Sequence, residues 1–226
     1  MLLRSAQLDA AAVPTAPFPL LIAHDVLQPD ALSALTSDFP RYRGAGFFPH
    51  EIGDCGTSVN ALVDELTAPA FADALGAQLG IDRLSRYPVL VTLCRSLDRR
   101  HGSIHTDSQS KVASALLYLN ADWPREEHGG CLRFLADPKD IESTLAPEIT
   151  PVFGTLTAFR RTDNSFHGHL PFEGERHVIQ VAWLVDEAAR DRKTRRGRTS
   201  RFVKWVAGRA DRWFGKNRDK NAAHLD

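Results

Sequence analysis

The pattern of apolar and polar residues changes near residue 88, and the two parts of the chain predict different elements. Before it, apolar positions recur at roughly helical spacing in two stretches. They predict one helix that begins near Pro29 and runs to about Ser37, and another from about Ser58 to Leu79 that Pro69 interrupts. After residue 88, short apolar runs separated by Gly, Pro and Asn predict strands. Helices are therefore expected near the N-terminal end and strands in the remainder.

The predicted strands are short and are bounded by turn residues. They cover residues 20–23, 89–94, 104–107, 112–120, 131–135, 151–160, 165–170 and 177–184. Residues 95–102 and 136–150 are polar connections in this interpretation. Strands at roughly ten-residue spacing, preceded by helices, predict a mainly β fold with supporting N-terminal helices, either a β-sandwich or a jelly roll.

Composition and length indicate one domain with a segment at each end. The 226 residues suffice for one sizeable core, and the 43% apolar and 25% charged fractions are near the globular average. We expect a flexible lead-in at 1–16, the β domain at 17–185 and a basic, partly helical tail at 186–226. No apolar run is long enough to predict a transmembrane segment, and the N-terminus is too weak for a signal peptide.

The net charge of zero hides a division between the body and the tail. From Asp186 onward, 13 Lys and Arg stand against 6 Asp and Glu, whereas the preceding residues carry 15 basic and 22 acidic side chains. A charge run at 190–198 is followed by Phe202, Val206 and Trp213 at helical spacing. The tail therefore favours either a helix packed on the protein's own body or contact with an anionic surface, such as a membrane, a nucleic acid or an acidic protein.

The three cysteines are Cys55, Cys94 and Cys131, which is an odd number at wide spacing. This argues against a disulfide framework and predicts a reducing, cytoplasmic location. Cys94 and Cys131 lie in apolar strand patterns and are interpreted as ordinary core residues.

The candidate chemistry lies between His105 and Arg176. If residues 104–107 form a strand, His105 and Asp107 share a face and can reach one metal ion. Two imidazoles and one carboxylate suit non-haem Fe(II) and O₂ chemistry. His167 is the best placed third ligand, with His169 and His177 as competitors. A zinc hydrolase could use the same residue types, but it would leave Arg176 without a role.

The order of these motifs resembles a known family. HxD at His105, YLN at Tyr118, GG at Gly129 and SxHxxxPxxGxR from Ser165 to Arg176 resemble the Fe(II)/2-oxoglutarate-dependent dioxygenases, in particular their prolyl-4-hydroxylase-like branch. The resemblance covers about 18–185 and implies a double-stranded β-helix, or jelly roll. It further implies that the iron ligands are His105, Asp107 and His167.

The resemblance also implies the cofactors and their binding residues. Arg176 matches the residue that binds the distal carboxylate of 2-oxoglutarate, and Tyr118 the residue whose hydroxyl assists there. Ser114 shares strand parity with Tyr118 and is a further candidate for lining that pocket. The partners are Fe(II), 2-oxoglutarate, O₂ and a substrate not yet identified, with succinate and CO₂ released. Ascorbate is a candidate additional cofactor.

Two residues bear on the reaction and the substrate. Halogenating relatives carry a small residue at the carboxylate position, so the resemblance implies hydroxylation for a chain with Asp107. Arg95 stands where some protein prolyl hydroxylases carry an aromatic residue, and with Arg99 and Arg100 it predicts a pocket rim for an anionic or polar substrate. Alternatively, 95–101 is a solvated connection. Gln180 shares parity with Arg176 and is either pocket-facing or structural.

The sequence therefore predicts a hydroxylase that depends on Fe(II) and 2-oxoglutarate, and three alternatives concern its substrate and activity. The first is a hydroxylase of a small molecule or sugar-linked metabolite. The second is a peptidyl prolyl hydroxylase, which Arg95 disfavours for a collagen-type substrate. The third is a non-catalytic jelly-roll module that binds a metal, which the joint presence of the triad and Arg176 disfavours.

Overall fold

A six-stranded antiparallel sheet lies at the centre of the computed structural model, which describes residues 1–4, 6–9, 17–124, 128–197 and 199. The strand order is β1-β6-β4-β8-β3-β2. The strands are β1 (Leu20–Ala23), β2 (Phe47–Pro49), β3 (Val89–Leu97), β4 (Lys111–Tyr118), β6 (Leu156–Arg160) and β8 (Gly174–Leu184). A second, two-stranded sheet pairs β5 (Arg133–Phe134) with β7 (His167–Gly168).

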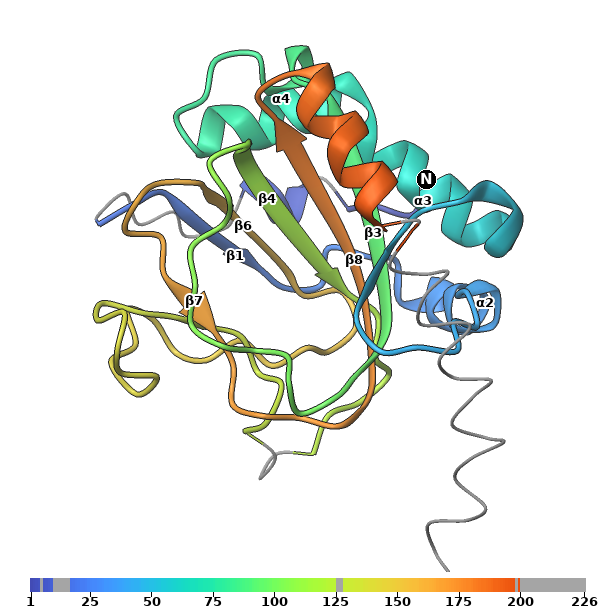
Figure 1. Ribbon diagram of the computed structural model, residues 1–226. Coiled ribbons are helices and arrows are strands. Elements are labelled where there is room, and N and C mark those ends of the chain that lie inside the picture. Colours follow the sequence, from blue (N-terminus) through green and yellow to red (C-terminus); the bar gives the residue numbers. More distant parts are fainter. Residues whose placement is uncertain (5, 10–16, 125–127, 198, 200–226) are drawn as a thin grey trace, which may run out of the picture.

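The helices that precede β3 lie on one side of the large sheet (Figure 1). They are α1 (Ala6–Asp9), α2 (Leu32–Asp38), α3 (Thr57–Thr67) and α4 (Pro69–Gln78), with short 3₁₀ turns at Pro29–Ala31, Ile52–Asp54 and Leu84–Arg86. Pro69 begins α4 and separates it from α3, because proline lacks the N–H that a helix interior requires but fits the first helical position.

The alternation along β8 assigns its side chains to two different environments. Ile179, Val181 and Trp183 are buried in the main core, between the sheet and the helices. Val178 and Ala182 face the opposite side, on which β5 and β7 lie. Successive strand residues point to opposite faces, so Arg176 and Gln180 also lie on that second side. We call it the site face of the sheet.

The predicted fold class is confirmed, with local differences in the strands. The structure is a mainly antiparallel β jelly roll with N-terminal helices. Residues 104–107 are not a regular strand: His105 makes only an isolated bridge with His167. β3 continues to Leu97, so the first residues of the predicted 95–102 loop are strand. The pairing of β3 with β8 holds these residues, with an irregularity between Cys94 and Ser96.

The described part of the N-terminal segment packs on the body, contrary to the expectation of a flexible lead-in. Leu3 and Leu8 are buried in the main core, and Leu3 pairs with Leu27. The Glu65 carboxylate in α3 accepts hydrogen bonds from the backbone N–H groups of Leu2 and Leu3. Apolar burial therefore holds the described residues of this segment against the body, while 5 and 10–16 lie outside the described residues.

The basic tail begins with a helix at 187–197, which we call the C-terminal helix. It contains most of the charge run, whereas the helix was predicted after that run. Ala189 anchors it in a small buried cluster with Ala182 and Leu184 of β8. The predicted positions Phe202, Val206 and Trp213 lie outside the described residues. Among the described residues, no helix has the length and apolar character that a membrane crossing requires.

Candidate functional site

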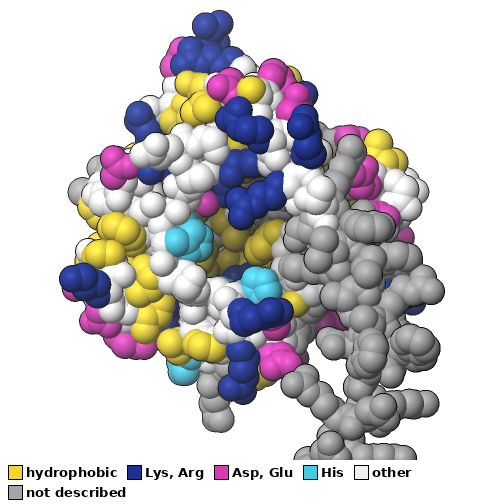
Figure 2. Space-filling view, in the orientation of Figure 1, with side chains coloured by type: hydrophobic (Ala, Val, Ile, Leu, Met, Phe, Trp, Pro, Cys, Tyr) yellow, Lys and Arg dark blue, Asp and Glu magenta, His cyan; other side chains and the backbone are white. Residues whose placement is uncertain are grey.

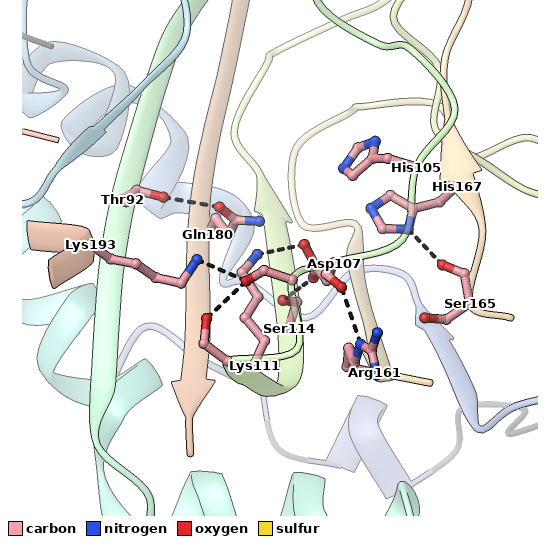
Figure 3. Close-up of polar contacts among 12 residues, drawn as sticks. Thr92, His105, Asp107, Lys111, Ser114, Arg161, Ser165, His167, Gln180 and Lys193 are labelled. Atoms are coloured by element: carbon pink, nitrogen blue, oxygen red, sulfur yellow. Dashed lines mark hydrogen bonds and ion pairs between the residues drawn. The ribbon is translucent and has the colours of Figure 1, made fainter. Parts of the chain in front are cut away.

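The three predicted metal ligands converge on the site face. One ligand atom from each of His105, Asp107 and His167 lies within 4.8 Å of the other two. Backbone hydrogen bonds in both directions between His105 and His167 hold the two histidines together, at 3.0 and 2.9 Å. Asp107 reaches the same point from the segment that leads into β4 (Figure 3). A two-histidine, one-carboxylate set with an open side suits Fe(II).

The two imidazole rings are oriented by backbone carbonyls. Nδ1 of His105 lies 2.8 Å from the Ser103 carbonyl oxygen, and Nδ1 of His167 lies 3.0 Å from that of Ser165. Because a carbonyl oxygen only accepts, each Nδ1 carries the proton and donates it. The lone pair of each ring is therefore on Nε2, which is the arrangement that metal-binding histidines use.

Asp107 is nearly buried and both of its carboxylate oxygens have partners. Lys111 Nζ donates to Oδ1 at 2.7 Å, and Ser114 Oγ donates to Oδ2 at 2.6 Å. Arg161 Nε donates to the Asp107 backbone carbonyl at 3.1 Å. Each carboxylate oxygen has two acceptor positions, so these hydrogen bonds leave lone pairs for a metal ion.

The surroundings of Asp107 and His167 favour the protonation states that bind a metal. Burial acts to raise the pKa of Asp107, but Lys111, His167 and the Ser114 hydroxyl outweigh it and hold the pKa at about 2. Burial lowers the pKa of His167 to about 4. The carboxylate is therefore ionised and the imidazole neutral, as metal ligation requires.

Arg176 and Tyr118 form the second part of the candidate site. Arg176 is 2% exposed and Tyr118 is fully buried. The Arg176 guanidinium lies over the Tyr118 ring, 5.0 Å from its centroid, and donates from Nη2 to the Tyr118 hydroxyl at 3.3 Å. Burial raises the pKa of Tyr118, so its hydroxyl keeps a proton that it can donate.

The Arg176 guanidinium has no carboxylate within ion-pair distance among the residues that the structure describes. Its third observed contact is neutral, from Nε to the Gly130 carbonyl oxygen at 2.8 Å. A buried charge without a counter-charge is costly, which makes this position suitable for an anionic ligand. The residues present therefore fit the distal carboxylate of 2-oxoglutarate.

The second glycine of the GG motif, Gly130, is required by the backbone conformation at this position. Gly130 adopts φ +74°, a backbone conformation that residues with a side chain rarely adopt. A Cβ atom here would also lie 3.1 Å from the Phe172 ring and 3.2 Å from that of Trp123. The glycine thus allows the turn whose carbonyl accepts from Arg176.

The competing histidines do not join the triad. His169 Nδ1 lies 2.7 Å from the Leu170 carbonyl oxygen, and burial together with the Arg176 charge lowers its pKa to about 4. His177 stacks on Phe39, with ring centroids 4.7 Å apart. Of the three candidates, only His167 belongs to the cluster that the described residues form around one point.

Ser114 has a different partner from the one expected. It does lie on the site face, but its hydroxyl donates to the metal-ligand candidate Asp107. Lys111 and Arg161, which also hold Asp107, were not anticipated from the sequence. Lys111 is four residues from Asp107, but no helix connects them, so the spacing itself carried no signal.

The arginine-rich segment is largely neutralised by acidic neighbours. Arg95 pairs with Glu175 at 2.7 Å and Arg100 with Asp98 at 2.6 Å, while Arg99 lies 3.6 Å from Glu173. Each arginine predicted to bind an anionic substrate therefore already has a carboxylate partner. The segment has the character of a solvated connection rather than a free cationic rim.

Comparisons with known proteins agree with this geometry. Residues 91–185 match the sequence model of the family described as the 2OG-Fe(II) oxygenase superfamily. This range contains all six candidate residues, namely His105, Asp107, Ser114, Tyr118, His167 and Arg176. No curated protein sequence matches the chain.

Solved structures share the fold at low sequence identity. A Pseudomonas putida prolyl-4-hydroxylase is 20% identical, with a TM-score of 0.57 over 80% of this chain and 98% of that one. A Trichoplax adhaerens prolyl hydroxylase, solved with a hypoxia inducible factor peptide, is 17% identical with a TM-score of 0.50 over 76% and 86%. A viral collagen prolyl hydroxylase from Paramecium Bursaria Chlorella virus-1 is 18% identical, again at 0.50, over 74% and 90%.

Proposed function

Because residues 91–185 match the model of the 2OG-Fe(II) oxygenase superfamily, we propose that the chain is a member of it and hydroxylates an organic substrate, with 2-oxoglutarate consumed and succinate and CO₂ released. The observation that carries this proposal is the buried guanidinium of Arg176, which has no carboxylate partner among the described residues. The triad of His105, Asp107 and His167 supplies the second requirement, a place for the metal.

Each residue has a defined task in this proposal. Nε2 of His105, Nε2 of His167 and one Asp107 oxygen would hold Fe(II), which supplies O₂ activation once 2-oxoglutarate is bound. Arg176 binds the distal carboxylate of 2-oxoglutarate through a charge-assisted fork, and Tyr118 donates its hydroxyl proton to the same group.

The residues around Asp107 preserve its orientation. Ser114 and Lys111 each bind one carboxylate oxygen, so the side chain cannot rotate without losing both hydrogen bonds. We assign Ser114 to this positioning role rather than to contact with 2-oxoglutarate. A carboxylate held at this position occupies the place that a halide would need, which supports hydroxylation over halogenation.

The substrate class is a separate part of the proposal. The similar solved structures are named as prolyl hydroxylases, and one was solved with a peptide. This chain carries Arg95, paired with Glu175, where a prolyl hydroxylase of protein substrates can carry an aromatic residue. We therefore favour a small-molecule substrate, with a peptidyl proline as the alternative that the assay below includes.

Succinate formation from 2-oxoglutarate tests the function. The protein is supplied with Fe(II), 2-oxoglutarate and O₂, with and without ascorbate, and challenged with a library of small acids, their neutral analogues and proline-containing peptides. We expect one class to raise succinate formation, and His167→Ala to abolish it. Binding of metal and 2-oxoglutarate without succinate from any class would instead favour the non-catalytic binding module.

The cellular location is the last part of the proposal. The chain has three cysteines, Cys55, Cys94 and Cys131, an odd number at wide spacing that argues against a disulfide framework. The lack of a disulfide framework is typical of proteins in reducing compartments, which supports a cytoplasmic location.

A further inference from the structure

A cavity of about 340 Å³ lies on the site face, between the large sheet and the C-terminal helix. Thr92 of β3 and Gln180 of β8 form its floor, joined by a 3.1 Å hydrogen bond from the Thr92 hydroxyl to Gln180 Oε1. Lys193 and Arg196 of the C-terminal helix contribute to its wall. Leu90 and Ala182 add apolar surface. None of these residues has a role in the site described above.

The C-terminal helix is held closely against the sheet. Besides the buried Ala189, Lys193 Nζ donates to Ser108 Oγ at 2.9 Å. At the far end, a Cβ on Gly197 would lie 2.5 Å from Pro49 Cγ in β2, nearer than side chains allow. The helix can make this approach only because residue 197 is glycine. Its position is therefore built into the chain at both ends.

The cavity adjoins the metal-ligand triad. Lys111 lines the cavity and also binds Asp107 at 2.7 Å. Lys193 reaches Ser108, the residue next to Asp107 in the chain. In Figure 3, Lys193, Thr92 and Gln180 lie on one side of Asp107, and His105 and His167 on the other. A molecule in the cavity is thus beside the triad.

The basic side chains that line this cavity differ in whether a carboxylate neutralises them. The Lys111 ammonium is paired with Asp107. Within the described ranges, by contrast, no carboxylate lies within ion-pair distance of Lys193 or Arg196. Figure 2 shows Lys and Arg side chains leading down this face to the edge of a central hollow that has histidines at its rim. Two cations on a helix that packs against the sheet, beside the triad, are therefore available to a ligand.

We propose that Lys193 and Arg196 bind an anionic group of the substrate, a carboxylate or a phosphate, and so hold the substrate in the cavity with its reacting carbon toward the triad. This inference rests on the proposed function, since it names the class of substrate for the same site. The Gln180 amide and the apolar surface of Leu90 and Ala182 contact the remainder of the molecule.

The size of the cavity limits the substrate. About 340 Å³ is at the small end of ligand sites, which suits a small molecule. Arg196 provides a planar fork and Lys193 a point charge, a combination that binds either oxyanion. The substrate is therefore a small organic acid or a small phosphate ester.

Anion binding tests the proposal without knowledge of the substrate. The full chain is loaded under anaerobic conditions with Fe(II) and saturating 2-oxoglutarate, so that the Arg176 position is occupied. Inorganic phosphate and acetate are then titrated separately by calorimetry, which distinguishes the two anion sources. We expect at least one of them to bind the unaltered protein, and the double variant K193Q/R196Q to bind it at least about tenfold more weakly.

The matched control is the double variant R192Q/R195Q. It removes the same charge from the same helix, at exposed positions that do not line the cavity. Its anion affinity should stay within about twofold of the unaltered protein. The visible absorption of the Fe(II)–2-oxoglutarate complex, unchanged in both variants, shows that the triad and Arg176 remain intact.

The outcomes separate this inference from the proposed function. If neither anion binds, or if K193Q/R196Q binds as tightly as the control, the anion site is wrong even where the 2-oxoglutarate complex forms. If the complex does not form in the unaltered protein, the proposed function fails, while the same titrations still decide the anion site. In the succinate assay, acids should be preferred over their amides, and K193Q/R196Q should lose this preference.

Discussion

The site has two cationic ends that differ in burial and in what holds them. Arg176 is buried, lies on the Tyr118 ring and is fixed by the Gly130 carbonyl. Lys193 and Arg196 lie on a helix at the protein surface, where Arg196 is exposed. A buried guanidinium in a fixed geometry suits one invariant ligand, because its desolvation is offset only by a matching carboxylate. The more exposed pair suits recognition of a variable substrate at low desolvation cost.

The arginine-rich segment at 95–100 differs from both of these cationic ends. It is as basic in sequence as the C-terminal helix, but acidic partners neutralise Arg95, Arg99 and Arg100. The number of basic residues in a segment therefore does not measure the charge that it offers to a ligand. Burial and the distance to the nearest carboxylate decide that.

The largest expected effect is the loss of the metal ion that would lie between the two cationic ends. His167→Ala should abolish Fe(II) binding, because it removes one of three ligands. His169→Ala is the matched control, since His169 is outside the triad and binds a backbone carbonyl. Iron affinity measured by calorimetry under anaerobic conditions checks both. Loss of iron in the His169 variant alone would show that the third ligand was chosen wrongly.

The second prediction concerns the buried guanidinium of Arg176. Arg176→Gln should raise the 2-oxoglutarate concentration for half-maximal binding at least about thirtyfold, since losing one partner of a buried charge pair costs about 2–5 kcal/mol. Titration followed by the absorption of the Fe(II) complex measures it. Phosphate binding at the Lys193 end should be unaffected. An unchanged 2-oxoglutarate requirement would refute the role of Arg176.

The third prediction separates two roles for Ser114. Removing its hydrogen bond to Asp107 by Ser114→Ala should weaken Fe(II) affinity by about tenfold, as for other groups that orient metal ligands. The 2-oxoglutarate concentration for half-maximal binding, measured at saturating iron, should not change. The reverse result, with iron binding intact and 2-oxoglutarate binding weakened, would show that Ser114 contacts 2-oxoglutarate instead.

A smaller effect is expected from salt, which should weaken ligand binding at the exposed cationic end more than at the buried one. Raising the ionic strength from about 0.1 to 1 M shortens the Debye length from about 10 to about 3 Å. Anion binding at Lys193 and Arg196 should therefore weaken several-fold, whereas 2-oxoglutarate binding at the buried Arg176 should change by less than about twofold. Equal salt dependence of the two calorimetric affinities would contradict the difference in burial.

The smallest effect is expected in the arginine-rich segment. Arg95→Gln removes a partly exposed ion pair with Glu175, which is worth about 1 kcal/mol or less. Anion affinity and the preference of the succinate assay for acids should both remain as in the unaltered protein. If Arg95→Gln lowered anion affinity as much as K193Q/R196Q does, residues 95–101 would be the substrate-recognition segment instead.

The sequence predicted much of the fold because the patterns involved are local. Short apolar runs located β1, β4 and most of β8, and Pro69 marked the division between α3 and α4. The prediction of a strand at 104–107 was wrong, because the chain pairs there for a single residue and then turns away. His105 and Asp107 still meet, by way of the bridge to His167 rather than by strand parity.

The residues proposed to bind the metal and the cosubstrate could be identified from the amino-acid sequence alone. The motif order between His105 and Arg176 carries the residue types that such a site needs, in a short part of the chain. Which basic side chains lack a carboxylate partner, by contrast, follows only from the folded arrangement of the described residues. Glu175 neutralises Arg95 across 80 residues, and the C-terminal helix brings Lys193 to Ser108 across 85. Whether a basic side chain has a carboxylate within ion-pair distance depends on residues that are far apart in the chain. No local sequence pattern encodes those distances.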